Sequence, residues 1–203
     1  MDWKILLGLM LVLIVVGCVN NTESPLKNLL AVPSSYCATY STQLSSARGN
    51  TNTTIEFCKD SKNRAVYAKA MDMAVLSFCL EGKGYTCFQG SCSEDTSNCD
   101  SSEDAMDKVN TNKYEEKFYE HIADRNIGGV MAKCYRVDTI KAAKTSGADI
   151  SNILEQNKFM QFCYHPIYKY VLYYSYDGIT TEVQNFVTPA PTSKFVLPSS
   201  SQM

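Results

Sequence analysis

Histidine and tryptophan are the residues that this chain most nearly lacks, with two and one among 203 residues. Its two histidines, His121 and His165, are far apart, and the nine cysteines form no C-x-x-C pair. The closest cysteine spacing, from Cys87 to Cys92, has no histidine beside it. Zinc sites and thioredoxin-like redox pairs depend on those spacings. We therefore expect no metal centre and no cofactor.

Short catalytic motifs are missing as well. The chain contains no G-x-S-x-G, no H-E-x-x-H, no phosphate-binding glycine loop and no G-x-G-x-x-G. These patterns place a nucleophile, a zinc ion or a phosphate group in each of their enzyme classes. Their absence favours a protein that binds or scaffolds over one that catalyses.

Positive charge is not in excess. Lysine and arginine number 19 against 21 aspartates and glutamates, which gives a net charge of −2. Nucleic-acid binding depends on clustered lysine and arginine side chains that neutralise phosphates. We therefore expect no nucleic-acid partner.

The apolar run Ile5–Val16 is too short to span a bilayer, which takes about 20 residues. Its length is typical of the apolar region of a signal peptide. The sequence predicts a signal peptide over residues 1–17 and places the rest of the chain outside the cytoplasm. An uncleaved anchor over Ile5–Val19 is the alternative that stays open.

The run ends in Val15-Val16-Gly17-Cys18. This stretch resembles the lipobox of prokaryotic lipoproteins, and the resemblance covers these first residues only. It implies that the thiol of Cys18 carries diacylglycerol and that Cys18 begins the mature chain. The protein would then be attached by lipid to the outer face of a membrane, with residues 18–35 as its tether.

Setting Cys18 aside leaves an even number of cysteines, which in an exported chain predicts a disulfide framework. Eight cysteines allow on the order of 100 pairings, so spacing alone does not fix the connectivity. Clustering suggests that the four from Cys79 to Cys99 pair among themselves and that Cys134 pairs with Cys163. The disulfide candidates are Cys37, Cys58, Cys79, Cys87, Cys92, Cys99, Cys134 and Cys163.

Helices are expected over much of the middle of the chain. Ser61–Glu81 is apolar on most sides, with Ser61 as a cap and Gly82 as a stop, and is expected to be a central buried helix. A capping box at Asn112–Glu115 predicts a helix that ends at Gly128. Further helices are expected from Gly129 to Lys144 and from Asp149 toward Cys163.

Asp177-Gly178 stands between two runs rich in aromatic and β-branched residues. That dipeptide predicts a two-residue type I′ hairpin over Tyr168–Val187, with Tyr176 opposite Ile179 and Tyr174 opposite Thr181. Together with the helices it gives an α+β fold, a disulfide-stapled helical domain with a small antiparallel sheet. The single domain is expected over residues 36–187, followed by a largely disordered Pro/Ser-rich tail over 188–203.

The same register predicts a row of tyrosines on one face of the hairpin. Packing under the helices accounts for them most simply, with each hydroxyl reaching a partner. They would otherwise form an open binding platform for a glycan or a protein of the cell envelope. The platform candidates are Tyr168, Tyr170, Tyr174 and Tyr176.

Two carboxylate arrangements are weaker candidates. Glu116 and Glu120 lie one turn apart on the helix expected there, beside His121, and would suit a secreted carboxylate-dependent hydrolase or a metal site. The acids around Asp95 and Asp100 could attract calcium, but they fail the EF-hand spacing. The first hypothesis is therefore a lipid-anchored, non-enzymatic binding or scaffolding domain, with the hydrolase as the alternative.

Overall fold

The computed structural model describes residues 29–46, 49–70, 73–97, 99, 104, 106, 116–145, 147 and 158–198. The expected signal peptide and Cys18 lie outside these residues. Among the described residues, no helix is long and apolar enough to cross a membrane.

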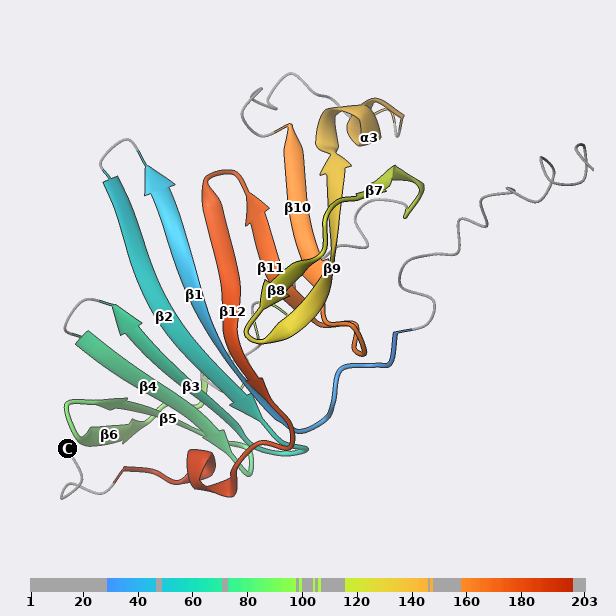
Figure 1. Cartoon of the computed structure of the whole chain (residues 1–203). Helices are drawn as coiled ribbons and strands as arrows, with labels where there is room; N and C mark the ends of the chain where they lie inside the picture. Colours follow the sequence, from blue (N-terminus) through green and yellow to red (C-terminus); the bar gives the residue numbers. More distant parts are fainter. Residues whose placement is uncertain are drawn as a thin grey trace, which may run out of the picture.

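The fold is dominated by a 12-stranded antiparallel sheet (Figure 1). Its main path runs β6-β5-β4-β3-β2-β1-β12-β11-β10-β9-β7, and β8 pairs with β9 beside this path. The strands are β1 (Tyr36–Ser46), β2 (Gly49–Lys59), β3 (Arg64–Ala70), β4 (Met73–Leu80), β5 (Lys83–Phe88), β6 (Ser91–Glu94), β7 (Tyr119–His121), β8 (Arg125–Ile127), β9 (Val130–Asp138), β10 (Phe159–Tyr164), β11 (Val171–Tyr176) and β12 (Ile179–Val187).

Two meanders make up this sheet, and they join where β1 pairs with β12. Strands β1–β6 follow one another outward to one edge, while β12, β11, β10, β9 and β7 run outward to the other. Because neighbours are antiparallel, the turns after β1, β3, β5 and β11 lie at one end of the sheet, the tip end. Residues 29–35 enter β1 at the opposite end, the tether end (Figure 1).

The expected α+β fold is therefore wrong. Ser61–Glu81 forms no helix: it contains β3 and β4, which pair with each other from Arg64–Cys79 to Ala70–Met73. Apolar side chains lie on both faces of these strands: Phe78 is buried on one face, whereas Met73 and Val75 are exposed on the other, so the polar alternation that would identify a strand is missing. A strand that is apolar on both faces and a buried helix give the same apolar run.

The other helix predictions are also corrected. Gly129–Lys144 is β9 followed by the helix α3 (Thr139–Thr145), so only its last part is helical. The Asn112–Gly128 region holds the 3-10 turn η2 (Glu116–Phe118) and then β7 and β8, while Asn112–Glu115 lies outside the described residues. Most of the expected helix from Asp149 also lies outside them, and its last residues form β10.

The C-terminal hairpin is confirmed around its turn, but its first strand, β11, begins at Val171 and does not include Tyr168. Tyr176 pairs with Ile179 and Tyr174 with Thr181. Asp177 and Gly178 both have positive φ, 54° and 73°, as a type I′ turn requires. A side chain at Gly178 would also approach the carbonyl oxygen of Ser45 to 3.0 Å, so glycine is required there twice over.

All eight expected cysteines form disulfides. Cys79 bonds Cys99 and Cys87 bonds Cys92, which confirms the clustering argument, and Cys134 bonds Cys163 as expected. The remaining pair is Cys37–Cys58. Three of the four join residues directly opposite each other on neighbouring strands, so each fixes the register of a strand pair.

Each face of the sheet carries its own hydrophobic cluster. The tail face of β1–β5 carries Cys37, Cys58 and Phe78 and packs against Ala190, Phe195 and Leu197. The 3-10 turn η4 (Thr192–Phe195) belongs to this covering segment, so residues 188–198 of the expected disordered tail are packed on the sheet. The opposite face, the tyrosine face, carries the larger cluster around Tyr36, Tyr40, Phe57, Tyr170 and Phe162.

Candidate functional site: the open tip end of the tyrosine face

A row of apolar side chains crosses the tyrosine face. Strand register places Phe88 beside Val75, Val75 beside Ala68, and Ala68 beside Ile55. The row continues through Tyr40 to Val183, which are both buried. Because side chains in register across a sheet share a face, these residues form one continuous surface.

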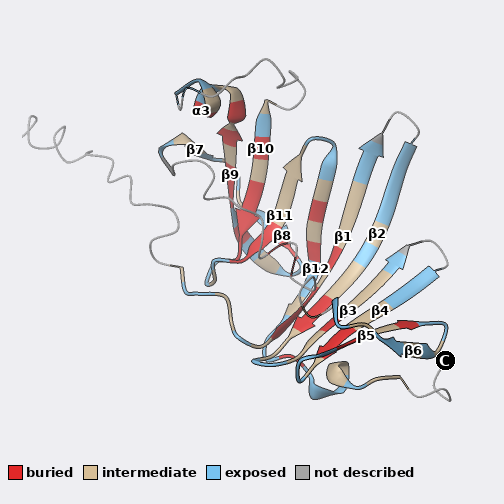
Figure 2. Ribbon diagram, turned by 180° about the vertical axis from the view of Figure 1, so that it is seen from behind, coloured by how far each residue is buried: buried red, intermediate tan, exposed pale blue. Residues whose placement is uncertain are grey.

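Toward the tip end this surface is open. Its large apolar side chains there are between 38 and 62% exposed, namely Leu44, Met73, Val75, Phe88 and Ile179. Figure 2 shows the same gradient, with exposed residues where the strands splay and buried ones where they converge. We call these five residues, with the threonines between them, the open face.

Threonines separate the apolar residues of the open face. Thr51 lies opposite Leu44, and Thr42 lies opposite both Thr53 and Thr181. The hydroxyls of Thr42 and Thr181 are hydrogen-bonded at 3.1 Å. The open face therefore combines exposed apolar groups with hydroxyls that can donate and accept hydrogen bonds.

At the tether end the same face is closed by the chain itself. Strands β6 and β7 lie near opposite edges of the sheet, so the connection between them has to cross a face. Asp104 and Met106, from that connection, are both buried, and Met106 belongs to the cluster of the tyrosine face. The tyrosine face is the one that the connection crosses.

Asp104 is held by two buried tyrosines. Its Oδ2 accepts hydrogen bonds from the hydroxyls of Tyr36 at 2.6 Å and Tyr170 at 2.8 Å, and its Oδ1 accepts one from the Met106 amide. Burial, and then the charge of Asp104, raise the pKa of Tyr170, so its hydroxyl stays a donor. Nothing in the sequence pattern singled out Asp104 for this role.

The four predicted platform tyrosines are not equivalent. Tyr170 is fully buried, so its ring is closed to a ligand. Tyr168 packs against His165 and Phe186, with ring centroids 4.9 and 6.3 Å away. Tyr174 and Tyr176 are half-buried on the tyrosine face, and Tyr176 lies beside Ile179 of the open face.

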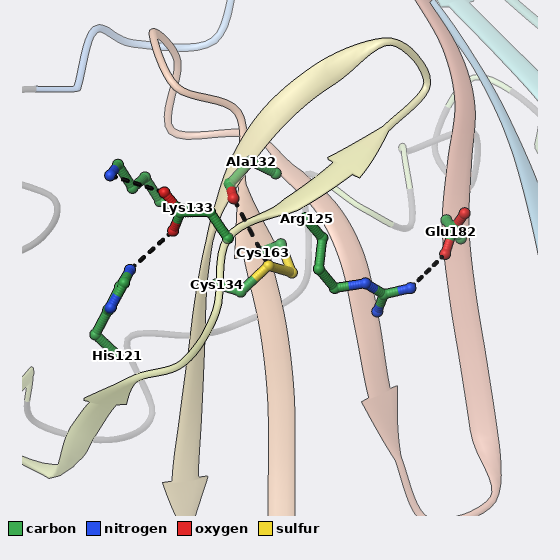
Figure 3. The surroundings of a disulfide bond; sticks show 8 residues. His121, Arg125, Ala132, Lys133, Cys134, Cys163 and Glu182 are labelled. Carbon is green, nitrogen blue, oxygen red and sulfur yellow. Dashed lines mark hydrogen bonds and ion pairs between the residues drawn. A yellow bond between two sulfur atoms is a disulfide. The ribbon is translucent and has the colours of Figure 1, made fainter.

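Of the carboxylate candidates, Glu120 is engaged elsewhere, and Glu116 begins the 3-10 turn η2. Glu120 forms a two-point ion pair with Arg136, at 2.8 Å for each carboxylate oxygen. His121, the next residue, points to the other face of β7 and contacts Asp124, which Lys133 also binds at 2.9 Å (Figure 3). Hydrogen bonds from Lys133 and then His121 lower the pKa of Asp124. The structure does not bring Glu120 and His121 together.

Other charged groups in Figure 3 hold the β8–β9 hairpin against β11 and β12. Arg125 of β8 binds Glu182 of β12 at 3.2 Å and stacks over the ring of Tyr173, 4.2 Å from its centroid. The hairpin therefore covers part of the tail side of β11 and β12. These contacts have a structural explanation.

The potential metal ligands are likewise bonded to other groups. Among the described residues, one group of potential ligands lies within reach of a single ion: Cys37, Glu56 and Cys58. The two sulfur atoms are joined in a disulfide, and Glu56 binds Lys194 at 2.6 Å. Asp95 instead bonds the amide and hydroxyl of Ser97, and Asp100 lies outside the described residues.

Comparisons with known proteins identify no family for this chain. No family model matches the chain, and no curated protein matches its sequence. A solved structure described as a putative outer membrane lipoprotein-sorting protein domain from Vibrio parahaemolyticus aligns with 81% of this chain and 91% of its own. The identity is 9% and the TM-score 0.30, values at which the likeness carries no argument about fold or function.

The residues of the open face were missed at the sequence level because three of them, Met73, Val75 and Phe88, fell in a region assigned to a helix and an irregular loop. As a strand, Met73–Leu80 places Val75, Ser77 and Cys79 on one face.

Proposed function

We propose that this protein is a non-enzymatic binding domain of the cell envelope that holds a protein partner against its open face. The observation that carries the proposal is the set of five large, exposed apolar side chains at the tip end. Large apolar side chains exposed together on one face of a sheet are typical of interaction sites.

The composition of the open face favours a protein over lipid acyl chains. Thr51 and Thr53 lie among the apolar residues, and hydroxyls that acyl chains covered would lose their hydrogen bonds to water without replacement. The backbone and side chains of a protein can replace those bonds. Protein interfaces combine an apolar centre with such polar groups.

The position of the open face fits attachment through Cys18. Residues 29–35 enter at the tether end, whereas the open face lies at the tip end. A chain attached by a lipid on Cys18 would present the open face away from its membrane. Supporting this arrangement are the lipobox-like stretch and the disulfide framework, which suits an oxidising compartment outside the cytoplasm.

The test replaces Val75, and separately Phe88, with a photo-crosslinking amino acid in the cells that make the protein. The same protein should be crosslinked from both positions. Its binding to the purified chain should then fall at least about tenfold in Val75→Glu and Phe88→Glu, because a charge on an apolar interface is left unpaired.

Ile167→Glu is the matched control. Ile167 is also half exposed but lies between β10 and β11 at the tether end, so this variant should bind like the parent. Crosslinks only to lipid, or only to a second copy of the chain, would contradict the proposal. So would equal loss of binding in Ile167→Glu.

A further inference from the structure

A hollow lies on the tail face at the tether end, away from the open face. It encloses about 410 Å³, within the range of small-ligand sites. The turns after β2 and β4 form one side of it, and the C-terminal segment that covers the tail face forms the other.

The floor of the hollow is amphipathic. The rings of Tyr85 and Phe195 and the side chains of Leu80 and Leu197 line it, and all four are half-buried against the tail-face cluster. Tyr85 lies on β5, whereas Phe195 comes from η4. Two rings from distant parts of the chain are thus brought to one small site.

The rim is polar and balanced in charge. Glu81 and Lys83 are exposed and flank Gly82, and positive φ values at Glu81 and Gly82 give the tight turn that puts both charges beside the hollow. Asn63 completes the rim. Its Oδ1 accepts a hydrogen bond from the Glu81 amide at 3.0 Å, which ties the turns after β2 and β4 together.

From this arrangement we propose that the hollow binds a saccharide. A sugar ring has an apolar C–H face that packs on aromatic rings and a circle of hydroxyls that both donate and accept hydrogen bonds. Tyr85 and Phe195 supply the rings, the Glu81 carboxylate accepts, and the Lys83 ammonium donates. Because one negative and one positive group share the rim, a neutral ligand fits better than a strongly charged one.

This proposal is independent of the protein partner at the open face, which lies at the other end of the sheet. The saccharide could belong to a free glycan or to the headgroup of a glycolipid. Both sources present the same ring chemistry to the hollow, and the hollow lies at the tether end, where a membrane-attached chain would meet either.

The test measures binding of the whole chain to an array of immobilised neutral hexose and N-acetylhexosamine oligosaccharides, and to vesicles that contain a glycosylated diacylglycerol. Binding should weaken about three- to tenfold in Phe195→Leu and Tyr85→Leu, as expected for loss of one ring contact. Lys83→Ala, an exposed change, should weaken it without affecting folding.

Phe159→Leu is the control, because Phe159 is also partly exposed but lies on β10. Binding to the array identifies a free glycan, and binding to the vesicles alone identifies a headgroup. Either result supports the proposal if Phe195→Leu, Tyr85→Leu and Lys83→Ala weaken the binding. Absence of binding to both, or binding that Phe195→Leu and Lys83→Ala leave unchanged, would overturn it.

Discussion

Asp104 is the single residue on which the closed end of the tyrosine face depends most. Its buried carboxylate accepts bonds from two tyrosines and a backbone amide, and bonds to a charged group are the stronger kind. Without this carboxylate, the buried hydroxyls of Tyr36 and Tyr170 would lose the acceptor that they share.

We expect Asp104→Asn to lower the free energy of unfolding by about 2–4 kcal/mol, since the amide removes the charge and replaces one of the two accepting oxygens with an N–H donor. Denaturant midpoints measure the change. Asp95→Asn is the control, because Asp95 accepts its bonds from Ser97 at the surface, and it should stay within about 1 kcal/mol of the parent. Equal denaturant midpoints for the two variants would show that the buried Asp104 carboxylate does not stabilise the fold.

His165 makes stability depend on pH. It is 7% exposed, and its Nδ1 accepts hydrogen bonds from the amides of Ile167 and Tyr168 at 3.1 and 3.3 Å. Burial lowers the pKa of His165 below its ordinary value of 6.5. A protonated Nδ1 would place a third hydrogen between two donors, so the folded state favours the neutral ring.

Because the folded-state pKa is the lower one, the unfolded chain binds the proton first as pH falls. The contribution of His165 is therefore fully present above about pH 6.5 and is lost progressively below it. In His165→Asn, Oδ1 can accept in place of Nδ1 but does not titrate. The variant should show a shallower loss of stability between about pH 6.5 and 5, measured by denaturant unfolding, and an unchanged slope would rule out His165 as the cause.

The C-terminal segment is the element whose role the sequence least suggested. Prolines and serines there predicted a disordered tail, yet Phe195 and Leu197 pack on the tail face. Lys194 adds two anchors, an ion pair with Glu56 and a carbonyl that accepts from the Tyr67 hydroxyl at 2.7 Å. Segment 188–198 thus completes a core that the strands leave uncovered.

Ending the chain after Val187 should lower the free energy of unfolding by about 2–5 kcal/mol, from the apolar area returned to water. It should also expose Tyr67, whose pKa burial and the charge of Glu56 raise to about 12. One more tyrosine should then ionise near its ordinary value of 10 in a tyrosinate absorbance titration. Ending the chain after Pro198 is the control, and a matching loss there would locate the effect beyond the packed segment.

An element could be predicted from the sequence where the interactions that determine it lie close together in the chain. The β11–β12 hairpin was predictable because Asp177-Gly178 sets its own turn geometry, and the cysteine clusters were predictable because their partners lie close in the chain. The β3–β4 hairpin was not, because apolar residues on both its faces, some of them exposed, remove the alternation that marks a strand. Asp104 and the open face depend on register between distant strands, which no local pattern encodes.

For the whole molecule, the expected attachment through a lipid on Cys18 is the first prediction to test. If Cys18 carries diacylglycerol, protein extracted from its own membranes should have the mass of a chain beginning at Cys18 plus lipid. Under denaturing, non-reducing conditions no thiol should be alkylated, because the other eight cysteines are paired. Cys18→Ser should abolish the lipid mass, and a variant of unchanged mass that stays in the membrane would indicate an uncleaved anchor instead.

The pairing of β1 with β12 sets the order in which an exported chain can fold. Strands β1–β6 can form their hairpins as they emerge, since each pairs with its neighbour in sequence. The second edge of β1, however, waits for β12, from the far end of the described chain. Until β12 has been synthesised, a strand bearing Tyr36, Ala38 and Tyr40 therefore lies unpaired along one side, open to the strands of other nascent molecules. Early closure of Cys37–Cys58 would hold that strand in register until its partner arrives.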